Sequence, residues 1–168
     1  MIDDELFALA QALGQALQRG GLMLGTAESC TGGLVAGAVT AVPGSSAWFD
    51  RGMATYSNQA KIDLLGVAPQ SLERYGAVSE QVAREMAAGV LAASPGIGIS
   101  VSTTGVAGPG GGTADKPVGM VCFGFARRSE EGLLVCAATK HFEGDRDQVR
   151  QASVRYALEG VLALTKAP

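Results

Sequence analysis

Short apolar runs that favour strands alternate with amphipathic helical patterns along most of this chain, and two strand-like runs then follow each other directly. Such alternation is typical of α/β proteins, in which helices cover both faces of a largely parallel sheet. The late pair of consecutive strands adds antiparallel pairing. We therefore expect a three-layer α/β/α sandwich with a mixed sheet. A length of 168 residues favours one domain over residues 1–168.

Apolar spacing and glycine or proline breaks set the expected boundaries. The N-terminal helix has one apolar face, made of Leu6, Leu9, Leu13, Ala16 and Leu17. Later helices are expected over 31–42, over 58–65, from a cap at Ser79 to about 93, and from Asp145 onward. Strands are expected over 22–27, 48–56, 97–103, 118–126 and 133–142, with a hairpin turn at 127–132.

The segment TAESCTGG, residues 26–33, joins the first expected strand to a helix. It offers Ser29, Cys30 and Thr31 as nucleophiles or donors. Backbone N–H groups at the start of a helix lie at the positive end of its dipole and stabilise charge that develops on an oxygen. The segment therefore suits acyl transfer or anion binding. The simpler interpretation is that Ser29 or Thr31 is only the N-cap of the helix.

Two neighbours of Ser29 also need an interpretation. Glu28 either orients a donor toward a substrate or makes a local ion pair. Cys30 is a rival nucleophile, because the pKa of a thiol falls near a helix N-terminus. Its only available imidazole partner is His141, in a late strand, which we interpret as a surface residue.

Tyr56 and Lys61 form the second candidate pair. If Ser57 caps the helix that follows, these two residues occupy the positions that pack together in a hydrophobic staple. Lys61 would then lie against the Tyr56 ring, where burial and the helix dipole lower its pKa toward a neutral amine. A Ser–Lys pair activates a hydroxyl without histidine. Alternatively, Lys61 lies on a solvated face of the helix.

The glycine-rich segment TGVAGPGGGTADKP, residues 104–117, follows the expected central strand. Ligands of open α/β sheets bind beyond the carboxyl ends of strands, so Thr104 and Gly105 are candidate ligands. The segment matches neither a Walker A sequence nor a dinucleotide fingerprint. A flexible entry to the hairpin explains it equally well. Arg146, near the start of the last helix, either reaches a substrate phosphate or is solvated.

Composition excludes several other classes of protein. The net charge is −3 and aromatic residues make up 5 %, which argues against nucleic-acid binding. One histidine and three scattered cysteines predict no metal site. The sequence shows no secretory leader and no apolar run long enough to span a membrane, so we expect a cytoplasmic protein. Its apolar residues and modest charge favour a homo-oligomer.

Five motifs in this order, TAESCTGG, TYSNQAK, YGAVSE, TGVAGPGGG with KPVG, and GDRDQVR, resemble the C-terminal domain family of the competence/damage-inducible protein CinA. The resemblance covers nearly the whole chain. It implies a mixed sheet of roughly five strands and hydrolysis of the carboxamide of nicotinamide mononucleotide (NMN) to nicotinate mononucleotide and ammonia, in pyridine-nucleotide recycling and without a cofactor. It assigns catalysis to Ser29, Tyr56 and Lys61.

Our hypothesis is that Lys61 takes the Ser29 proton, directly or through Tyr56, and that amides of the turn hold the oxyanion. Substrate-binding candidates are Glu28, Cys30, Thr31, Gly32, Gly33, Thr104, Gly105 and Arg146. Two alternatives remain. One is a non-catalytic module that binds a nucleotide or a partner and is linked to competence or DNA damage. The other is an amidase that acts on a different amide.

Overall fold

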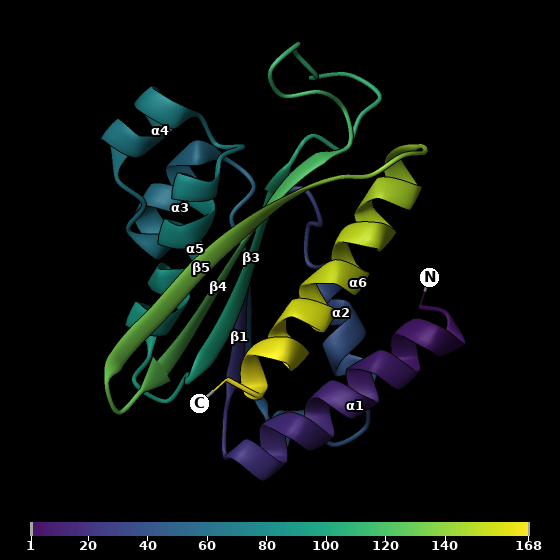
Figure 1. The fold of residues 1–168 in the computed structure, drawn as a ribbon, viewed down its shortest axis with the longest axis vertical. Helices are drawn as coiled ribbons and strands as arrows, with labels where there is room; N and C mark the ends of the chain where they lie inside the picture. Colours follow the sequence, from purple (N-terminus) through teal and green to yellow (C-terminus); the bar gives the residue numbers. More distant parts are fainter. Residues whose placement is uncertain (1, 168) are drawn as a thin grey trace.

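The computed structural model describes residues 2–167 and places five strands in one mixed sheet between two layers of helices (Figure 1). The spatial order is β2-β1-β3-β4-β5. Strand β1 pairs in parallel with β2 and β3, whereas β4 is antiparallel to β3 and β5. This confirms the expected architecture. The strands are β1 (Leu24–Glu28), β2 (Phe49–Ala54), β3 (Ile99–Gly105), β4 (Met120–Ser129) and β5 (Gly132–His141).

Each face of the sheet has its own layer of helices (Figure 1). One layer contains α1 (Asp4–Gly20), α2 (Leu34–Thr40) and α6 (Arg146–Thr165). In the other, α5 (Glu80–Ala93) packs on the sheet, and α3 (Asn58–Leu65) and α4 (Pro69–Tyr75) pack on α5. A 3-10 turn, η1 (Ser45–Ala47), precedes β2. Within residues 2–167, no helix combines the length and apolar character needed to cross a membrane.

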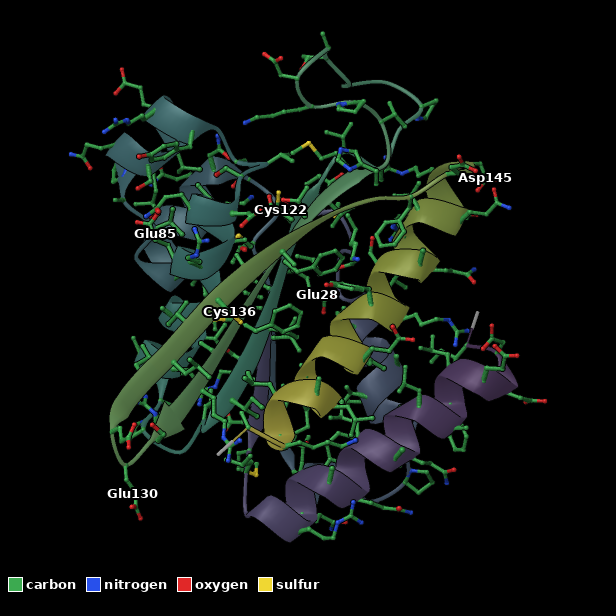
Figure 2. The ribbon with its side chains drawn as sticks, in the orientation of Figure 1. Glu28, Glu85, Cys122, Glu130, Cys136 and Asp145 are labelled. Carbon is green, nitrogen blue, oxygen red and sulfur yellow. The ribbon has the colours of Figure 1, made fainter. Side chains whose placement is uncertain are left out.

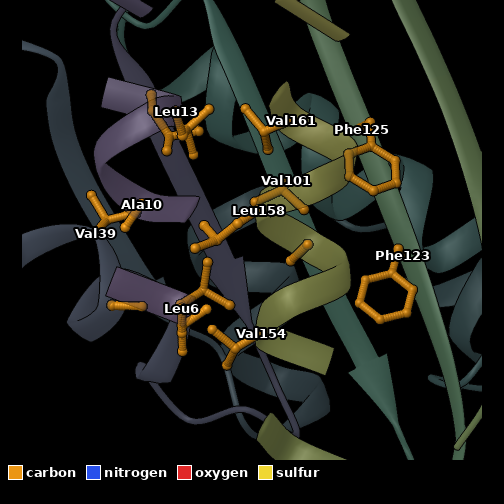
Figure 3. Packing of buried hydrophobic residues seen from close by; sticks show 14 of the residues in the cluster. Leu6, Ala10, Leu13, Val39, Val101, Phe123, Phe125, Val154, Leu158 and Val161 are labelled. Atoms are coloured by element: carbon orange, nitrogen blue, oxygen red, sulfur yellow. The ribbon is translucent and has the colours of Figure 1, made fainter. Parts of the chain in front are cut away.

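The helix α1 forms as its sequence predicts. The Asp3 side chain accepts a hydrogen bond from the Leu6 amide at the start, and Gly21 ends the helix with a left-handed backbone, φ +63°. Leu13 (Figure 3) and Leu17 are fully buried in the core that α1 shares with α6 and the sheet. Burial of each leucine contributes roughly 1.5–3 kcal/mol to stability.

A second core lies between α5 and the opposite face of the sheet. Val82, Met86 and Val90 of α5 are fully buried in it. Gly89 lets α5 approach α3 closely, because a Cβ at this position would lie 2.1 Å from the Leu65 carbonyl oxygen. This contact fixes α3, which carries Lys61, against the rest of the layer.

Two expected boundaries were wrong, and one short helix was missed. α2 begins at Leu34 rather than 31, because the preceding residues form a turn. The hairpin turn is shorter than expected, since Ser129 still pairs with Gly132. The sequence reasoning assigned no element to the segment that forms α4. This helix contains no fully buried residue and therefore lacks the apolar periodicity by which helices are found.

Candidate active site

Three parallel strands end at the same edge of the sheet. Glu28, the last residue of β1, lies in register with Ala54 of β2 and Thr103 of β3. The segments that follow these strands therefore emerge side by side (Figure 1). They are the Ser29 turn, the entry to α3 and the glycine-rich segment, which form the candidate site together with the start of α6.

Buried Glu28 holds the turn that carries Ser29 (Figure 2). Its carboxylate accepts hydrogen bonds from the Thr31 hydroxyl at 2.6 Å and from backbone amides at the start of α2. These amides are those of Val35 at 2.8 Å, Ala36 at 3.0 Å and Gly33 at 3.2 Å. The carboxylate thus serves as the anion at this helix N-terminus. Both Glu28 and Thr31 are buried in the turn and bind each other there, so they support the turn, and their contact with substrate stays a prediction.

The N-cap of α2 is Gly33, and no side chain of that residue caps the helix. Neither Ser29 nor Thr31 is the cap, so the simpler interpretation of the motif was also wrong. Gly32 and Gly33 have φ of +58° and +101°, a left-handed backbone that glycine adopts without strain. The two glycines therefore let the chain turn sharply between β1 and α2.

Only part of the turn is free to hold an oxyanion. The Gly32 amide donates to the Ser29 carbonyl at 3.1 Å and the Gly33 amide donates to Glu28. Within the described chain, the amides of Cys30 and Thr31 donate to no other residue, although the Cys30 amide also interacts with its own thiol. The expected role of Gly32 and Gly33 as donors was therefore wrong, and two adjacent amides directly after Ser29 remain available.

Lys61 is buried, with 1 % of its surface exposed. Its Nζ lies 3.1 Å from the Ser29 Oγ, 2.9 Å from the Thr55 carbonyl oxygen and 3.3 Å from the Tyr56 carbonyl oxygen. Burial lowers the pKa of Lys61 below its usual 10.5. No carboxylate of residues 2–167 forms an ion pair with it. The alternative of a solvated lysine was wrong.

The local fold that positions Lys61 follows the sequence prediction. The Ser57 hydroxyl oxygen accepts a hydrogen bond from the Ala60 amide at 3.0 Å and caps α3. Lys61 then occupies the fourth helical position and turns inward, toward the end of β1. The cap therefore sets which face of α3 meets Ser29.

Tyr56 lies differently from the expectation. Its side chain points outward, with 63 % of the residue exposed, and its hydroxyl accepts a hydrogen bond from Arg146 Nη2 at 3.3 Å. Its hydrogen bonds with Ser29 and Lys61 involve its backbone carbonyl only, at 3.5 and 3.3 Å. No hydrogen bond connects that hydroxyl to Ser29 or Lys61 in the described structure, so the geometry favours the direct route from Ser29 to Lys61 over the relay through the phenol.

A cavity of about 290 Å³ opens above Ser29. Its lining residues come from all four segments and are Ser29, Cys30, Tyr56, Gly105, Val106, Ala107, Gly108, Gly110, Gly111 and Arg146. Arg146 Nη1 donates to the Gly108 carbonyl at 2.7 Å, which joins α6 to the glycine-rich segment. Gly105 and Arg146 thus lie where they were expected. A larger hollow of about 680 Å³ at the hairpin tip, lined by residues 127–131, contains none of these groups.

Two candidates differ from what was expected of them: Thr104 does not face the cavity, and Cys30 faces it but is not activated as a nucleophile. The Thr104 hydroxyl is buried and donates to the Ala77 carbonyl at 2.8 Å, so it faces α5 rather than the cavity. Cys30 lines the cavity, but burial raises the pKa of its thiol to about 11. A thiol with this pKa remains protonated near neutral pH and is a poor nucleophile. His141 is exposed on the edge strand β5.

Arg150 is a site residue that the sequence reasoning missed. Its Nε donates to the Cys30 carbonyl at 3.2 Å and its Nη2 lies 3.4 Å from the Thr31 carbonyl oxygen. Both contacts hold the turn from the side of α6. The signal was present, because Arg146 and Arg150 are four residues apart and share one face of a helix.

Comparison with known proteins gives a consistent result. A family model described as the CinA C-terminal domain matches residues 6–165. "Nicotinamide-nucleotide amidohydrolase PncC" of Enterobacter agglomerans is 51 % identical over 162 residues, covering 96 % of both chains. The protein of the same name in Escherichia coli K12 is 49 % identical over 159 residues, covering 95 % of this chain and 94 % of the relative. The crystal structure of the competence/damage inducible protein CihA from Agrobacterium tumefaciens superposes with a TM-score of 0.90 at 44 % identity, covering 99 % of each chain.

Proposed function

The chain belongs to the CinA C-terminal domain family, and from this premise and the geometry of Ser29 and Lys61 we propose that it hydrolyses the carboxamide of NMN. The products are nicotinate mononucleotide and ammonia, and the reaction recycles pyridine nucleotides. The names of two relatives at 49–51 % identity support this choice of substrate.

The contact between a buried lysine and a serine carries the proposal. A neutral amine has two N–H bonds and one lone pair. At Lys61, the carbonyls of Thr55 and Tyr56 accept two N–H bonds, and Nζ lies within hydrogen-bond distance of the Ser29 Oγ, at 3.1 Å. A neutral amine has no third N–H bond, so in that form its lone pair is left to accept the proton of the Ser29 hydroxyl. Burial favours the neutral amine, since no carboxylate of the described chain compensates the charge.

The first half-reaction forms an acyl-enzyme. Lys61 Nζ takes the proton of the Ser29 hydroxyl while its Oγ bonds to the carboxamide carbon. The negative charge moves to the carboxamide oxygen, where the free amides of Cys30 and Thr31 donate to it. The C–N bond then breaks, and the proton on Lys61 passes to the departing nitrogen, which leaves as ammonia.

The second half-reaction reverses these roles. Water attacks the nicotinoyl ester of Ser29 and gives a proton to Lys61. The same two amides stabilise the second oxyanion. The bond between the acyl carbon and Oγ breaks, Lys61 returns the proton to Oγ, and the carboxylic acid product leaves. The pyridinium charge of NMN makes its carbonyl carbon more electrophilic in both steps.

Ammonia release from NMN tests the proposal. We expect Ser29→Ala and Lys61→Met to lose at least ~10²-fold in kcat/KM. Methionine preserves most of the apolar stem of Lys61 within the core. Exposed residues provide matched controls, Ser46→Ala and Lys166→Met, and both should retain full activity. Near-wild-type ammonia release from either site variant would contradict the mechanism.

A substrate panel separates the alternatives. NMN, nicotinamide and NAD are compared in the same ammonia assay, and NMN should give the highest kcat/KM. Faster turnover of free nicotinamide would favour an amidase with another substrate. Binding of NMN in calorimetry without any ammonia would favour a non-catalytic nucleotide-binding module.

A further inference from the structure

Arg150 contacts the Ser29 turn but does not line the cavity. It lies in the second turn of α6, which packs against α2 (Figure 1). Its Nε donates to the Cys30 carbonyl at 3.2 Å, and its Nη2 lies 3.4 Å from the Thr31 carbonyl oxygen. Within residues 2–167, no carboxylate forms an ion pair with this guanidinium. Its charge is therefore directed at two consecutive backbone carbonyls of the turn.

The contact with Cys30 fixes one peptide group of the turn. A trans peptide group is planar, so the carbonyl of Cys30 and the amide of Thr31 point in opposite directions. Arg150 is the only donor to the Cys30 carbonyl within the described residues. The Thr31 amide, at the other end of the same peptide group, is the one amide of residues 30–33 with no acceptor in the described structure. Arg150 therefore sets the direction of the amide that is left to bind an oxyanion.

The same contact makes the Thr31 amide a stronger donor. A hydrogen bond accepted by a carbonyl polarises the peptide group, and a charged donor polarises it most. The field of the guanidinium reaches the turn, because burial raises the pKa of the Cys30 thiol to about 11 and the charge of Arg150 acts in the opposite direction. Glu28 supplies no such effect, since its carboxylate binds the Thr31 hydroxyl and amides from that of Gly33 onward.

We propose that Arg150 is a positioning residue for the oxyanion, which orients and polarises the Cys30–Thr31 peptide so that the Thr31 amide donates to the carboxamide oxygen. This role rests on the proposed function, because it is defined for attack on a carboxamide. Negative charge develops on that oxygen only after attack begins, so a stronger donor raises kcat more than it tightens the binding of NMN. Arg150 acts through the peptide group and does not touch the substrate.

The guanidinium is accessible from a separate hollow. This hollow, of about 170 Å³, is lined by residues that include Leu34, Asp147 and Arg150, and it shares no lining residue with the cavity above Ser29. A small solute can therefore reach the Cys30 carbonyl in Arg150→Ala without entering the substrate cavity. Free guanidinium ion is the appropriate probe, because it carries the same kind of donors as the deleted side chain.

Steady-state release of ammonia from NMN tests this role. Arg150→Ala should lower kcat about 10- to 100-fold and change KM less than about threefold. Guanidinium chloride below denaturing concentrations should restore kcat at least several-fold, whereas sodium chloride of equal ionic strength should not. Arg150→Lys keeps the charge without the planar fork, so its kcat should be intermediate. Arg155, also on α6, lies near Asp3 and Glu5, and Arg155→Ala is the matched control that should keep the wild-type kcat.

Nuclear magnetic resonance gives a readout that needs no turnover. Loss of the hydrogen bond to the Cys30 carbonyl should move the amide nitrogen resonance of Thr31 upfield in Arg150→Ala and leave it in place in Arg155→Ala. The role is overturned if that resonance does not move, if the loss of activity appears in KM alone, or if guanidinium restores nothing to the folded Arg150→Ala protein. Should Arg150→Ala fail to fold, a wild-type kcat in Arg150→Lys overturns it.

The two proposals fail in different ways. A wild-type protein that releases no ammonia from NMN contradicts the proposed function. An active wild type whose kcat is unaltered by Arg150→Ala contradicts the positioning role alone.

Discussion

Replacement of Glu28 by glutamine tests whether one buried carboxylate organises the Ser29 turn. Oε1 accepts hydrogen bonds from the Thr31 hydroxyl and from two backbone amides, and Oε2 accepts one from the Ala36 amide and a longer one, 3.4 Å, from the Thr26 hydroxyl. In Glu28→Gln the side-chain oxygen can take only one of these two positions. The NH₂ group would then face at least one N–H donor that has lost its acceptor.

The expected loss follows from these contacts. An N–H donor left unsatisfied in a buried position costs roughly 1–3 kcal/mol, and each remaining bond weakens by about 1 kcal/mol when its acceptor loses its charge. The lower cost of burying a neutral amide offsets roughly 2 kcal/mol of this. We therefore expect Glu28→Gln to lower the free energy of unfolding by about 2–4 kcal/mol, a large fraction of the roughly 5–15 kcal/mol typical of a domain.

Urea denaturation followed by circular dichroism measures this loss. With a slope of roughly 2 kcal/mol per molar urea, the midpoint should fall by about 1–2 M. Glu130→Gln is the matched control, because Glu130 is exposed at the hairpin tip (Figure 2). If the midpoint of Glu28→Gln moves no more than that of the control, the carboxylate does not hold the turn and the reasoning is refuted.

Four further predictions follow from buried groups. Lys61→Met removes a desolvated amine but leaves the buried Thr55 carbonyl without its donor, so the thermal midpoint should change little. In the wild type, kcat/KM for NMN should rise as pH rises through the lowered pKa of Lys61. The pKa of the Cys30 thiol is about 11 in the folded protein against 9.0 for the free group, so its stabilisation is complete below pH 9 and is lost as pH rises toward 11. Urea midpoints of wild type and Cys30→Ala, compared across that range, should converge. Gly89→Ala should cost at least ~2 kcal/mol, because its Cβ would lie 2.1 Å from the Leu65 carbonyl oxygen, and an unchanged midpoint would contradict this contact.

The three layers and the pairing of Ser29 with Lys61 could be predicted from the sequence, because both depend on local patterns of residues. Alternating patterns imply a three-layer fold, and the Ser57 cap determines which residue of α3 faces the sheet. Lys61 could therefore be identified as a candidate base from the sequence alone. The glycines of the turn could also be recognised in the sequence. The acceptors of the nearby amides could not, because the Glu28 carboxylate accepts from donors up to eight residues away.

Side-chain direction explains the error at Thr104. Ser100, Ser102 and Thr104 alternate along β3 and all three hydroxyls donate to carbonyls that lie toward α5, those of Ala87, Ala83 and Ala77. Alternation in a strand placed Thr104 on the same face as the two serines. The sequence alone predicts that these three side chains lie on the same face of β3. Which face of the sheet this is depends on the packing of α5. The outward direction of Tyr56 likewise depended on Arg146, ninety residues away.

The reactive pair lies entirely within β1, α2, β2 and α3, residues 24–65, while the glycine-rich segment and α6 supply the outer wall of the cavity. The proposed nucleophile and base thus come from one stretch of the sequence and most of the cavity lining from another, although Arg150 of α6 also holds the Ser29 turn. A directed library restricted to positions 106–112 and 146 would change the wall of the cavity and leave the proposed Ser29–Lys61 pair unaltered.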